Sequence, residues 1–448
     1  MIHAAPAASF PPGPRLPAPL QTLRWTTHSP SLMEACHARY GDLFTLRFVA
    51  RAVAGRYAPR DEGRWVFLAD PEHVKQVFTA DPTLVRTGET NRFLLDLVGP
   101  SSILVLDEPE HMEHRRLLLP PLHGERVQRY AELIDDVARA EVARWPRGAP
   151  LALWPRMQAI TLEVIVRVVF GITEPARIER WGRLLTRLLN TGTGRAFVVA
   201  QALSTTLRGR PIRRAYDRLV GPVDAAIAEE LAHRRAAPDL DARDDILSLL
   251  IAARREDGSA LTDAELRDEL ITLLVAGHES TATMLAWAFE RLVRHPDMLA
   301  RVREEAHAGE DVYAEAVVQE TLRLRPVLPI VLRRLAAPLE LGGWTLPQGA
   351  WVAPCAYLVH RRPDVYPDPL AFQPERFLER KPGTYTWTPF GGGVRRCLGA
   401  SFAQLEMKRV LQVVVSAVEL RPAHSEAERI RPRFITLAPA RRAEVLLA

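Results

Sequence analysis

The sequence has few cysteines and no long apolar run, and each shortage excludes a class of protein. Only Cys36, Cys355 and Cys397 occur among the 448 residues, which is too few for a disulfide framework or a cysteine-rich zinc module and is typical of a reducing compartment. No stretch of about 18 consecutive apolar residues is present, so we expect no membrane anchor. The first residues lack the basic segment and apolar core of a signal peptide, and we therefore expect a cytoplasmic protein.

The charge balance gives little support to a nucleic-acid partner. The 59 basic and 54 acidic side chains leave a net charge of +5, and the two signs are interspersed along the chain without a zinc-finger or basic-region pattern. Apolar residues make up 47% and charged residues 25%, which is the ordinary globular mix and provides a large core. The composition thus predicts a globular protein that binds no nucleic acid.

Apolar periodicity predicts an α+β fold that is mainly α with small β-sheets. The longest predicted helix begins at Thr262, where Thr262 and Glu265 form a capping-box pattern, and it runs to His295. At 1.5 Å per residue it is about 50 Å long and crosses a whole domain. Apolar residues also recur at intervals of three and four in Pro71–Phe78, Pro109–Leu118, Glu125–Arg144, Leu153–Phe170, Ala176–Leu189, Pro211–Ala236 and Leu398–Val418.

Strands are predicted in three places, and nothing divides the chain into domains. Leu43–Phe48 and Trp65–Leu68 are typical of a hairpin, Val331–Val352 is a second β-rich patch, and the last thirty residues resemble short strands. Residues 354–393 are expected to be a long ordered coil. Residues 1–20 are rich in proline and alanine and are expected to be extended or mobile. Without a repeat, linker or composition break, residues 21–448 are predicted to form a single domain.

Cys397 lies in an unusual loop immediately before a predicted helix. The loop reads Phe390-Gly391-Gly392-Gly393-Val394-Arg395-Arg396-Cys397-Leu398-Gly399. Its glycines lack side chains and permit positive φ, so a flat partner can approach the backbone closely. The helix dipole and the two arginines favour a thiolate. A single thiolate without a nearby histidine suits a metal that brings its other ligands, as haem iron does; the alternative is an ordinary buried cysteine in a turn.

The loop resembles the haem-binding loop of the cytochrome P-450 family at Phe390, Gly393, Arg395, Cys397 and Gly399. Three further segments are similar to that family's motifs in the same order: Ala276-Gly277-His278-Glu279-Ser280-Thr281 to its oxygen-side helix, Glu320-Thr321-Leu322-Arg323 to its Glu-x-x-Arg helix, and Phe372-Gln373-Pro374-Glu375-Arg376-Phe377 to its Pro-Glu-Arg-Phe segment. The resemblance implies the cytochrome P-450 fold, with haem b between the long central helix and the helix that follows the cysteine loop.

The resemblance also implies which residues contact the haem. Cys397 is the implied axial ligand of the iron, and His111 and Arg115 are the implied propionate donors, one helical turn apart. Arg116 and Arg334 leave the register of the arginines open by one residue, and a solvated basic face is the alternative for each donor. The full set of implied cofactor contacts is Cys397, His111, Arg115, Arg333, Arg395, Phe390, Gly391, Gly399, Ala276 and Gly277.

Glu320, Arg323 and Arg376 resemble the family's buried structural triad. Alone, a Glu-x-x-Arg pair is typical of a solvated ion pair on a helix surface. Joined by Arg376, the pair is assigned here to folding around the haem and not to catalysis.

The long helix is expected to supply the other side of the iron. Ala276 and Gly277 remove side-chain bulk in mid-helix, where glycine costs about 1 kcal/mol relative to alanine, so something must need the space. The resemblance implies that dioxygen binds there and that Glu279 and a hydroxyl guide protons to it. The family usually has threonine at the hydroxyl position. This sequence has Ser280 followed by Thr281, and which of the two acts is left open.

The implied activity is that of a haem-thiolate monooxygenase. It would use O2 to hydroxylate or epoxidise a lipophilic small molecule, such as a fatty acid, terpenoid or polyketide, in secondary metabolism. The pocket walls implied by analogy are mostly aliphatic and comprise Phe93–Leu106, 190–206, Leu273–Ala276 and Val327–Val331. The alternatives are a peroxygenase or hydroperoxide isomerase of the same fold, against which Glu279 and Ser280 argue, and a non-catalytic haem-binding or recruiting protein, against which the intact cysteine and Glu-x-x-Arg pair argue.

Electrons are expected from a separate protein, because the haem domain consumes the chain. An acidic ferredoxin or flavodoxin with its NAD(P)H reductase suits the basic residues near the cysteine loop, and we expect the chain to be a monomer. The basic residues are Arg115, Arg116, Arg126, Arg395, Arg396, Lys408 and Arg409.

Overall fold

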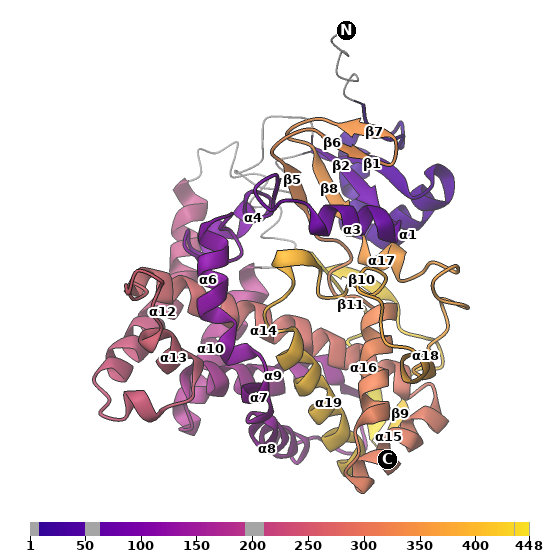
Figure 1. Cartoon of the computed structure of the whole chain (residues 1–448). Helices are drawn as coiled ribbons and strands as arrows, with labels where there is room; N and C mark the ends of the chain where they lie inside the picture. Colours follow the sequence, from indigo (N-terminus) through magenta and orange to yellow (C-terminus); the bar gives the residue numbers. More distant parts are fainter. Residues whose placement is uncertain (1–8, 50–62, 193–209, 434, 448) are drawn as a thin grey trace.

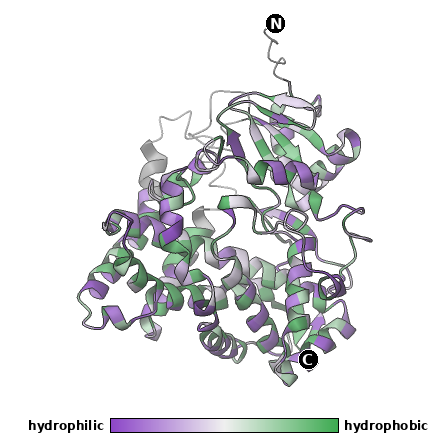
Figure 2. Ribbon diagram, in the orientation of Figure 1, coloured by the Kyte–Doolittle hydropathy of each residue, from purple (hydrophilic) through white to green (hydrophobic). Residues whose placement is uncertain are grey.

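The computed structural model describes residues 9–49, 63–192, 210–433 and 435–447. A helical body makes up most of the molecule, and a smaller β-rich region lies above it in the view of Figure 1. Figure 2 shows that most helices carry both hydrophobic and hydrophilic residues, as expected of amphipathic helices that pack against a core. The expected pocket wall 190–206 lies almost wholly outside the described residues.

The long helices follow the predicted periodicity closely. α9 has the predicted bounds, and the capping box of α14 is confirmed, because Thr262 N–H donates to Glu265 Oε2 at 2.8 Å and Glu265 N–H donates to Thr262 Oγ1 at 3.3 Å. The α-helices are α1 (Ala18–Tyr40), α3 (Pro71–Thr79), α4 (Gly88–Asn91), α5 (Leu95–Val98), α6 (Glu110–Leu118), α7 (Glu125–Gln128), α8 (Ala131–Val142), α9 (Leu153–Phe170), α10 (Pro175–Gly192), α12 (Arg210–Arg235), α13 (Ile246–Ala252), α14 (Asp263–Leu292), α15 (Pro296–Ala308), α16 (Val312–Leu324), α17 (Ala356–Val359), α18 (Glu375–Glu379) and α19 (Ala400–Ala417).

The helical body is organised around α14, which crosses it and packs most extensively against α9. α19 lies against α8, α14, α15 and α16. One continuous core runs through these helices and includes Trp181, Phe289 and Val410. The C-terminal half of α14, residues 281–290, is buried all round, so this helix is an axis of the core and not a surface helix.

The strands of the described residues form one five-stranded sheet and three smaller sheets. The larger sheet has the order β1-β2-β8-β5-β3, in which only β2 and β8 run parallel. The predicted hairpin is confirmed as β1 and β2; its tip, 50–62, lies outside the described residues. The strands are β1 (Leu43–Arg47), β2 (Arg64–Leu68), β3 (Val85–Arg86), β4 (Leu151–Ala152), β5 (Arg333–Leu335), β6 (Leu339–Leu341), β7 (Trp344–Leu346), β8 (Trp351–Pro354), β9 (Leu420–Pro422), β10 (Ile430–Arg433), β11 (Thr436–Pro439) and β12 (Glu444–Leu447).

Three parts of the predicted fold are wrong. The expected extended segment 1–20 ends at Pro17, because Ala18 begins α1, and its residues 1–8 lie outside the described part. Helix α1 was missed because a kink at His28 and the internal Pro30 interrupt its apolar spacing. The predicted helix Glu125–Arg144 is divided into α7 and α8, with Tyr130 at the break. The expected coil after Pro354 also contains the short helices α17 and α18.

The described helices include none with the length and apolar character needed to cross a membrane.

Candidate active site

The cysteine loop turns tightly before α19. Cys397 N–H donates to the carbonyl of Phe390 at 3.0 Å, and Gly391 and Gly393 have φ of +68° and +65°, which favour glycine. Cys397 lies deep in the protein and is nevertheless exposed, so it faces an internal space and not the outer surface. Among the described residues no cluster of three or more histidine, cysteine or carboxylate side chains could hold a metal.

Two glycines of this loop pack against α3, and two others border open space. A Cβ on Gly393 would lie 2.1 Å from the carbonyl oxygen of Phe78 on α3, and a Cβ on Gly392 would lie 2.3 Å from the Phe78 ring. These two glycines therefore admit α3 and not a flat cofactor, which corrects the sequence interpretation. A Cβ on Gly399 would meet nothing within 4 Å, and one on Gly391 would reach only Val331 at 3.8 Å, so these two positions leave open space.

The electrostatics around the thiol differ from the expected thiolate-favouring setting. Burial raises the pKa of Cys397 overall, while a hydrogen bond from the Gly399 backbone and the guanidinium groups of Arg396 and Arg115 lower it. Arg395 is not among these groups. The polypeptide thus opposes the thiolate on balance, and the positive charge of a bound metal ion would lower the pKa of the thiol.

Arg333 is a buried cation that forms no ion pair with any of the described residues. It is 5% exposed, and its one hydrogen bond within the described part of the chain goes from Nη1 to the carbonyl of the preceding residue, Leu332, at 2.9 Å. Burial, and then the charge of Arg395, lower the pKa of Arg333 to about 9, and the charge of Asp107 raises it. A buried charge without a hydrogen-bonded counterion costs free energy, so Arg333 fits a site that an anionic group such as a haem propionate completes.

The neighbouring basic residues separate into site and surface residues. Arg334 pairs with Glu89 and Arg116 pairs with Glu256 on the exposed surface. Arg115, by contrast, is half-buried and donates from Nη1 to the carbonyl of Arg396 at 2.8 Å. The side chains that are turned inward are therefore those of Arg115 and Arg333.

Arg395 points away from the thiol, toward the chain segment before α6. Its guanidinium donates to the Ile103 carbonyl and to Asp107 Oδ1, each at 3.4 Å, and its side chain is 8% exposed. Burial lowers the pKa of Arg395 to about 10. Because those contacts are long, the group keeps donor capacity for an anion.

His111 is held by Glu108 at one side of its ring. Nδ1 lies 2.7 Å from Glu108 Oε1, so this nitrogen donates a hydrogen bond to the carboxylate. Burial and then the charges of Arg395, Arg115 and Arg333 lower the pKa of His111 to about 3. The prediction that Nε2 donates to a propionate stays a prediction.

The Glu-x-x-Arg pair is buried, as predicted. Glu320 and Arg323 are 0% exposed, with Arg323 Nε 2.6 Å from Glu320 Oε2 and Nη2 2.7 Å from Oε1. Arg376 Nε reaches Glu320 Oε1 at 3.3 Å, and this completes the triad. Three backbone carbonyls, of His360, Pro369 and Ala371, take the remaining N–H groups of Arg323.

His360 is a residue that sequence reasoning missed. It is fully buried, its Nδ1 lies 3.0 Å from the Arg323 carbonyl, and its Nε2 accepts the N–H of Thr388 at 2.8 Å. Burial and then Arg323 lower the pKa of His360 to about 3. A neutral His360 thus ties the end of α16 to the start of the cysteine loop. No sequence pattern marked it, because both of its partners are backbone groups.

One face of α14 is exposed or half-buried in the middle of the helix. Leu273, Ala276 and Ser280 are three and four residues apart and so share that face. Ala276 is exposed, and Leu273 and Ser280 are half-buried. Ser280 donates its hydroxyl to the Ala276 carbonyl at 2.8 Å, and Thr281 is 3% exposed. We call Leu273, Ala276 and Ser280 the open stripe of α14.

Gly277 does not belong to the open stripe. A Cβ at this position would lie 2.9 Å from Ile165 Cδ1 on α9. The space that the missing side chain leaves is therefore taken by helix packing, which corrects the expectation that it opens a notch for dioxygen.

Glu279 is held on the side of α14 that faces α9 and β10. Arg433 Nη1 lies 2.5 Å from Glu279 Oε1, and Gln158 Nε2 donates to Oε2 at 2.8 Å. The Arg433 guanidinium also lies 4.6 Å from the ring centroid of Trp154. The structure thus brings Ala276 and Ser280 together on one face and places the Glu279 carboxylate apart from them.

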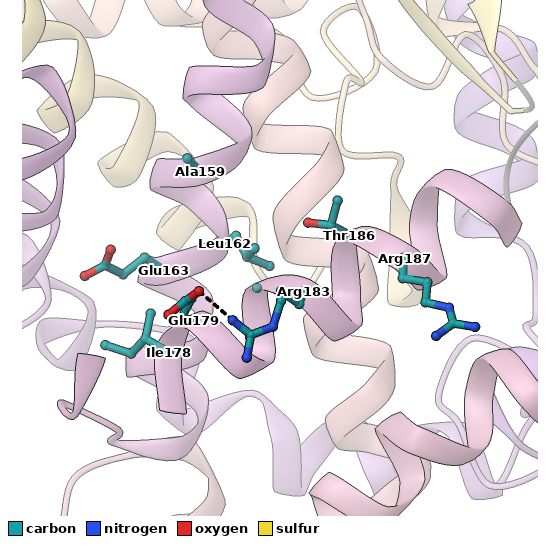
Figure 3. A pocket seen from close by; sticks show the side chains of 9 residues that line it. Ala159, Leu162, Glu163, Ile178, Glu179, Arg183, Thr186 and Arg187 are labelled. Carbon is teal, nitrogen blue, oxygen red and sulfur yellow. Dashed lines mark hydrogen bonds and ion pairs between the residues drawn. The ribbon is translucent and has the colours of Figure 1, made fainter. Parts of the chain in front are cut away.

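The described residues also line a groove between α9 and α10, which Figure 3 shows. It encloses about 540 Å³, and Glu179 and Arg183 form an ion pair across its wall at 2.5 Å. None of the predicted haem or oxygen-side residues lines it, so the groove is separate from the candidate active site. Its lining consists of Ala159, Leu162, Glu163, Ile178, Glu179, Gly182, Arg183, Thr186 and Arg187.

Comparisons with known proteins show which family the chain belongs to. Residues 11–446 match the Cytochrome P450 family model. A protein named cytochrome P450 135B1 in Mycobacterium tuberculosis is 42% identical over 444 residues, which is 97% of this chain and 91% of the relative. One named cytochrome P450 137 in the same organism is 39% identical over 450 residues, 98% of this chain and 91% of the relative.

Solved structures show the same fold. A cyanobacterial CYP120A1 with bound retinoic acid superposes with a TM-score of 0.82 at 23% identity, and the match covers 99% of this chain and 100% of that one. The haem domain of cytochrome P450DA gives a TM-score of 0.82 at 20% identity over 98% of each chain. The chain therefore belongs to the cytochrome P450 family, as a monooxygenase that binds haem b through a cysteine thiolate.

Proposed function

We propose that the haem lies between Cys397 and the open stripe of α14, with Arg333, Arg395 and Arg115 as propionate donors. The observation that carries this proposal is Arg333, because a buried cation without a carboxylate needs an anion to complete its site. Arginine suits a carboxylate because it donates two parallel hydrogen bonds. When bound, haem supplies a redox-active iron at which dioxygen is activated. Phe390, Gly391 and Gly399 remain proposed loop contacts.

Ser280 is the hydroxyl that we propose for proton delivery. It lies on the open stripe beside Ala276, whereas Thr281 is buried away from that face. Glu279 is the proposed source of the proton, since its side chain is 17% exposed and so retains access to solvent. Because Arg433 and Gln158 hold the carboxylate on the other side of the helix, transfer to Ser280 requires Glu279 to leave Arg433.

A lipophilic substrate is the second part of the proposal. The described parts of the expected pocket wall are mostly aliphatic, and Leu94, Leu97, Leu104 and Leu273 pack only partly buried against the core. Apolar walls select by size and buried area. A fatty acid, terpenoid or polyketide of secondary metabolism suits them, and the cyanobacterial structure holds a lipophilic carboxylic acid in the same fold.

An acidic ferredoxin or flavodoxin, fed by an NAD(P)H reductase, is the proposed electron donor. The basic surface is smaller than the sequence suggested, because Lys408 pairs with Asp311, and Arg409 with Asp135. Arg126 and Arg396 are exposed and form no ion pair within the described part of the chain, so they are the residues that we propose to face the donor. A salt-dependent reduction rate that falls in Arg126→Gln and Arg396→Gln supports this face; unchanged rates contradict it.

The proposed setting is a cytoplasmic monomer with one haem domain. The largest of the three hydrophobic clusters among the described residues runs through the helical body and supports a single domain. Its ordered part begins before residue 21, since Ser9 N–H donates to the Thr345 carbonyl at 3.0 Å and Thr45 N–H donates to that of Pro12 at 2.9 Å.

Turnover with defined co-substrates tests the proposed reaction. The holoprotein is incubated with a panel of fatty acids, terpenoids and polyketides, either with O2, NADPH, reductase and ferredoxin, or with hydrogen peroxide alone. Product that depends on O2 and NADPH, with one labelled oxygen atom from 18O2, supports the monooxygenase proposal. Product formed only with peroxide would instead support the peroxygenase alternative.

A further inference from the structure

Glu269 is a buried carboxylate of α14 to which the haem site assigns no role. It lies four residues before Leu273 and seven before Ala276, so it continues the open stripe toward the N-terminus of the helix. The stripe is exposed or half-buried from Leu273 to Ser280, whereas Glu269 is 0% exposed. Another part of the chain must therefore cover this end of the stripe.

The cover is the segment 99–104, between α5 and α6, which we call the strap. Three side chains of α14 bind it within two turns of the helix. Gly99 permits the close approach, because its φ is +87° and a Cβ would lie 2.0 Å from Asp268 Oδ1. The contacts are Ser101 N–H to Asp268 Oδ2 at 2.8 Å, Ile103 N–H to Glu269 Oε1 at 2.9 Å, and Ser102 Oγ to Thr272 Oγ1 at 2.7 Å.

Glu269 connects three elements at one oxygen atom. His114 of α6 places Nδ1 2.7 Å from the same Oε1 that accepts the N–H of Ile103. The carbonyl of Ile103, in turn, accepts a hydrogen bond from the guanidinium of Arg395. The strap is thus tied to α14 through Glu269 and to the cysteine loop through Arg395, so it spans the two sides of the candidate haem site.

No hydrogen bond from the described residues compensates for the burial of the second carboxylate oxygen of Glu269. Oε2 is buried and has no hydrogen-bond partner within the described residues, and burial raises the pKa of Glu269. An unsatisfied buried carboxylate oxygen costs free energy that an apolar side chain would avoid. A role other than stability accounts for a carboxylate here, and holding a backbone N–H of the strap is such a role.

We propose that Glu269 is a positioning residue that fixes the strap over the end of the open stripe and thereby limits the length of the lipophilic substrate. The proposal rests on the proposed function of the stripe as the haem-facing wall. Seven residues of helix separate Glu269 from Ala276, or about 10 Å along α14. When the strap is fixed, this stretch is closed to a ligand; when it is released, a longer apolar chain can extend along it.

Amide hydrogen exchange of the haem-loaded protein tests the tie itself. In Glu269→Leu, exchange at residues 101–105 should rise about tenfold or more relative to residues 281–290, because a hydrogen bond to a charged acceptor is lost. Glu269→Gln keeps an acceptor for Ile103 and should restore most of the protection. Asp263→Asn, on the exposed first turn of α14, is the matched control and should leave the strap unchanged.

Ligand length separates positioning from general weakening of the fold. Imidazole and 1-dodecylimidazole are titrated into the holoprotein and followed by the Soret shift. Glu269→Leu should strengthen binding of 1-dodecylimidazole about tenfold relative to imidazole, and Glu269→Gln should match the parent. If Glu269→Leu does not fold, Ser102→Ala, which removes one strap contact without stranding a charge, should give the same pattern with a smaller change.

The outcomes distinguish this inference from the proposed function. If imidazole gives no Soret shift in the parent, the proposed haem site is wrong, and exchange at 101–105 alone then decides the role of Glu269. If both ligands shift the Soret band but the ratio of their affinities and the exchange at 101–105 match the parent in every variant, Glu269 does not position the strap and the inference is overturned.

Discussion

Two buried arginines, Arg323 and Arg333, show how structural and ligand-binding charges differ in this chain. All five N–H groups of Arg323 have acceptors, two from Glu320 and three from backbone carbonyls. Arg333 is almost as buried, yet among the described residues it has one hydrogen bond, to Leu332, and no ion pair with a carboxylate. A buried arginine whose N–H groups all have acceptors needs nothing from outside the chain. A buried arginine whose N–H groups lack acceptors requires a partner from outside the chain, so these free donors indicate where a ligand binds.

The largest effect on stability is expected from the removal of Arg323. Arg323→Ala should cost about 3–5 kcal/mol of unfolding free energy, because Glu320 is left buried without its main partner. This is a large share of the unfolding free energy of a typical protein, which is about 5–15 kcal/mol. Soluble yield and denaturant unfolding provide the measurement. Normal yield, haem content and midpoint would show that the triad is dispensable for the fold.

Removal of Arg333 should have the opposite effect: little change in the stability of the fold and a loss of bound haem. Arg333→Met deletes a buried charge that lacks a counterion, so the unfolding free energy of the haem-free chain should stay within about 1 kcal/mol or rise. Haem retention should fall, because a propionate loses its donor. Haem-to-protein ratio and denaturant unfolding are measured together, with Arg334→Met as the neighbour that pairs with Glu89. If Arg333→Met and Arg334→Met retain haem equally, Arg333 is not a ligand-binding arginine and the contrast with Arg323 fails.

A smaller change is expected at the open stripe. Ser280→Ala should leave substrate-induced spectral shifts nearly intact, because Ser280 is proposed to move protons and not to bind substrate. Product per NADPH should fall, by up to about the hundredfold that a lost general acid costs, while hydrogen peroxide rises. Ser280→Thr should keep or improve coupling. Should Thr281→Ala uncouple the reaction and Ser280→Ala not, the hydroxyl role belongs to Thr281.

Much of the fold was predictable, because local signals determine it. The capping box at Thr262 and the apolar spacing of α9 depend on residues that are near each other in sequence. Helix α1 was not predicted, since a kink and buried polar side chains such as Gln21 and Ser29 hide its periodicity.

The site was predictable in residue type and less so in geometry. The resemblance to the family's motifs marked Cys397, Arg333 and Ser280. It could not show that Gly277 accommodates Ile165, because contacts between helices depend on tertiary packing. Nor could it show that Glu279 is held by Arg433, which lies 154 residues away along the chain.

The identity of the thiolate ligand tests the central claim most directly. The reduced carbon monoxide difference spectrum is recorded for the parent, Cys397→Ala, Cys36→Ala and Cys355→Ala. Cys36 and Cys355 are 4% and 0% exposed and pack inside the core, whereas Cys397 is exposed, so only the sulfur of Cys397 is accessible to a haem iron. We predict that only Cys397→Ala loses the thiolate-type Soret band. Retention of that band in Cys397→Ala, or its loss in either of the other two variants, would contradict the assignment of Cys397 as the haem ligand.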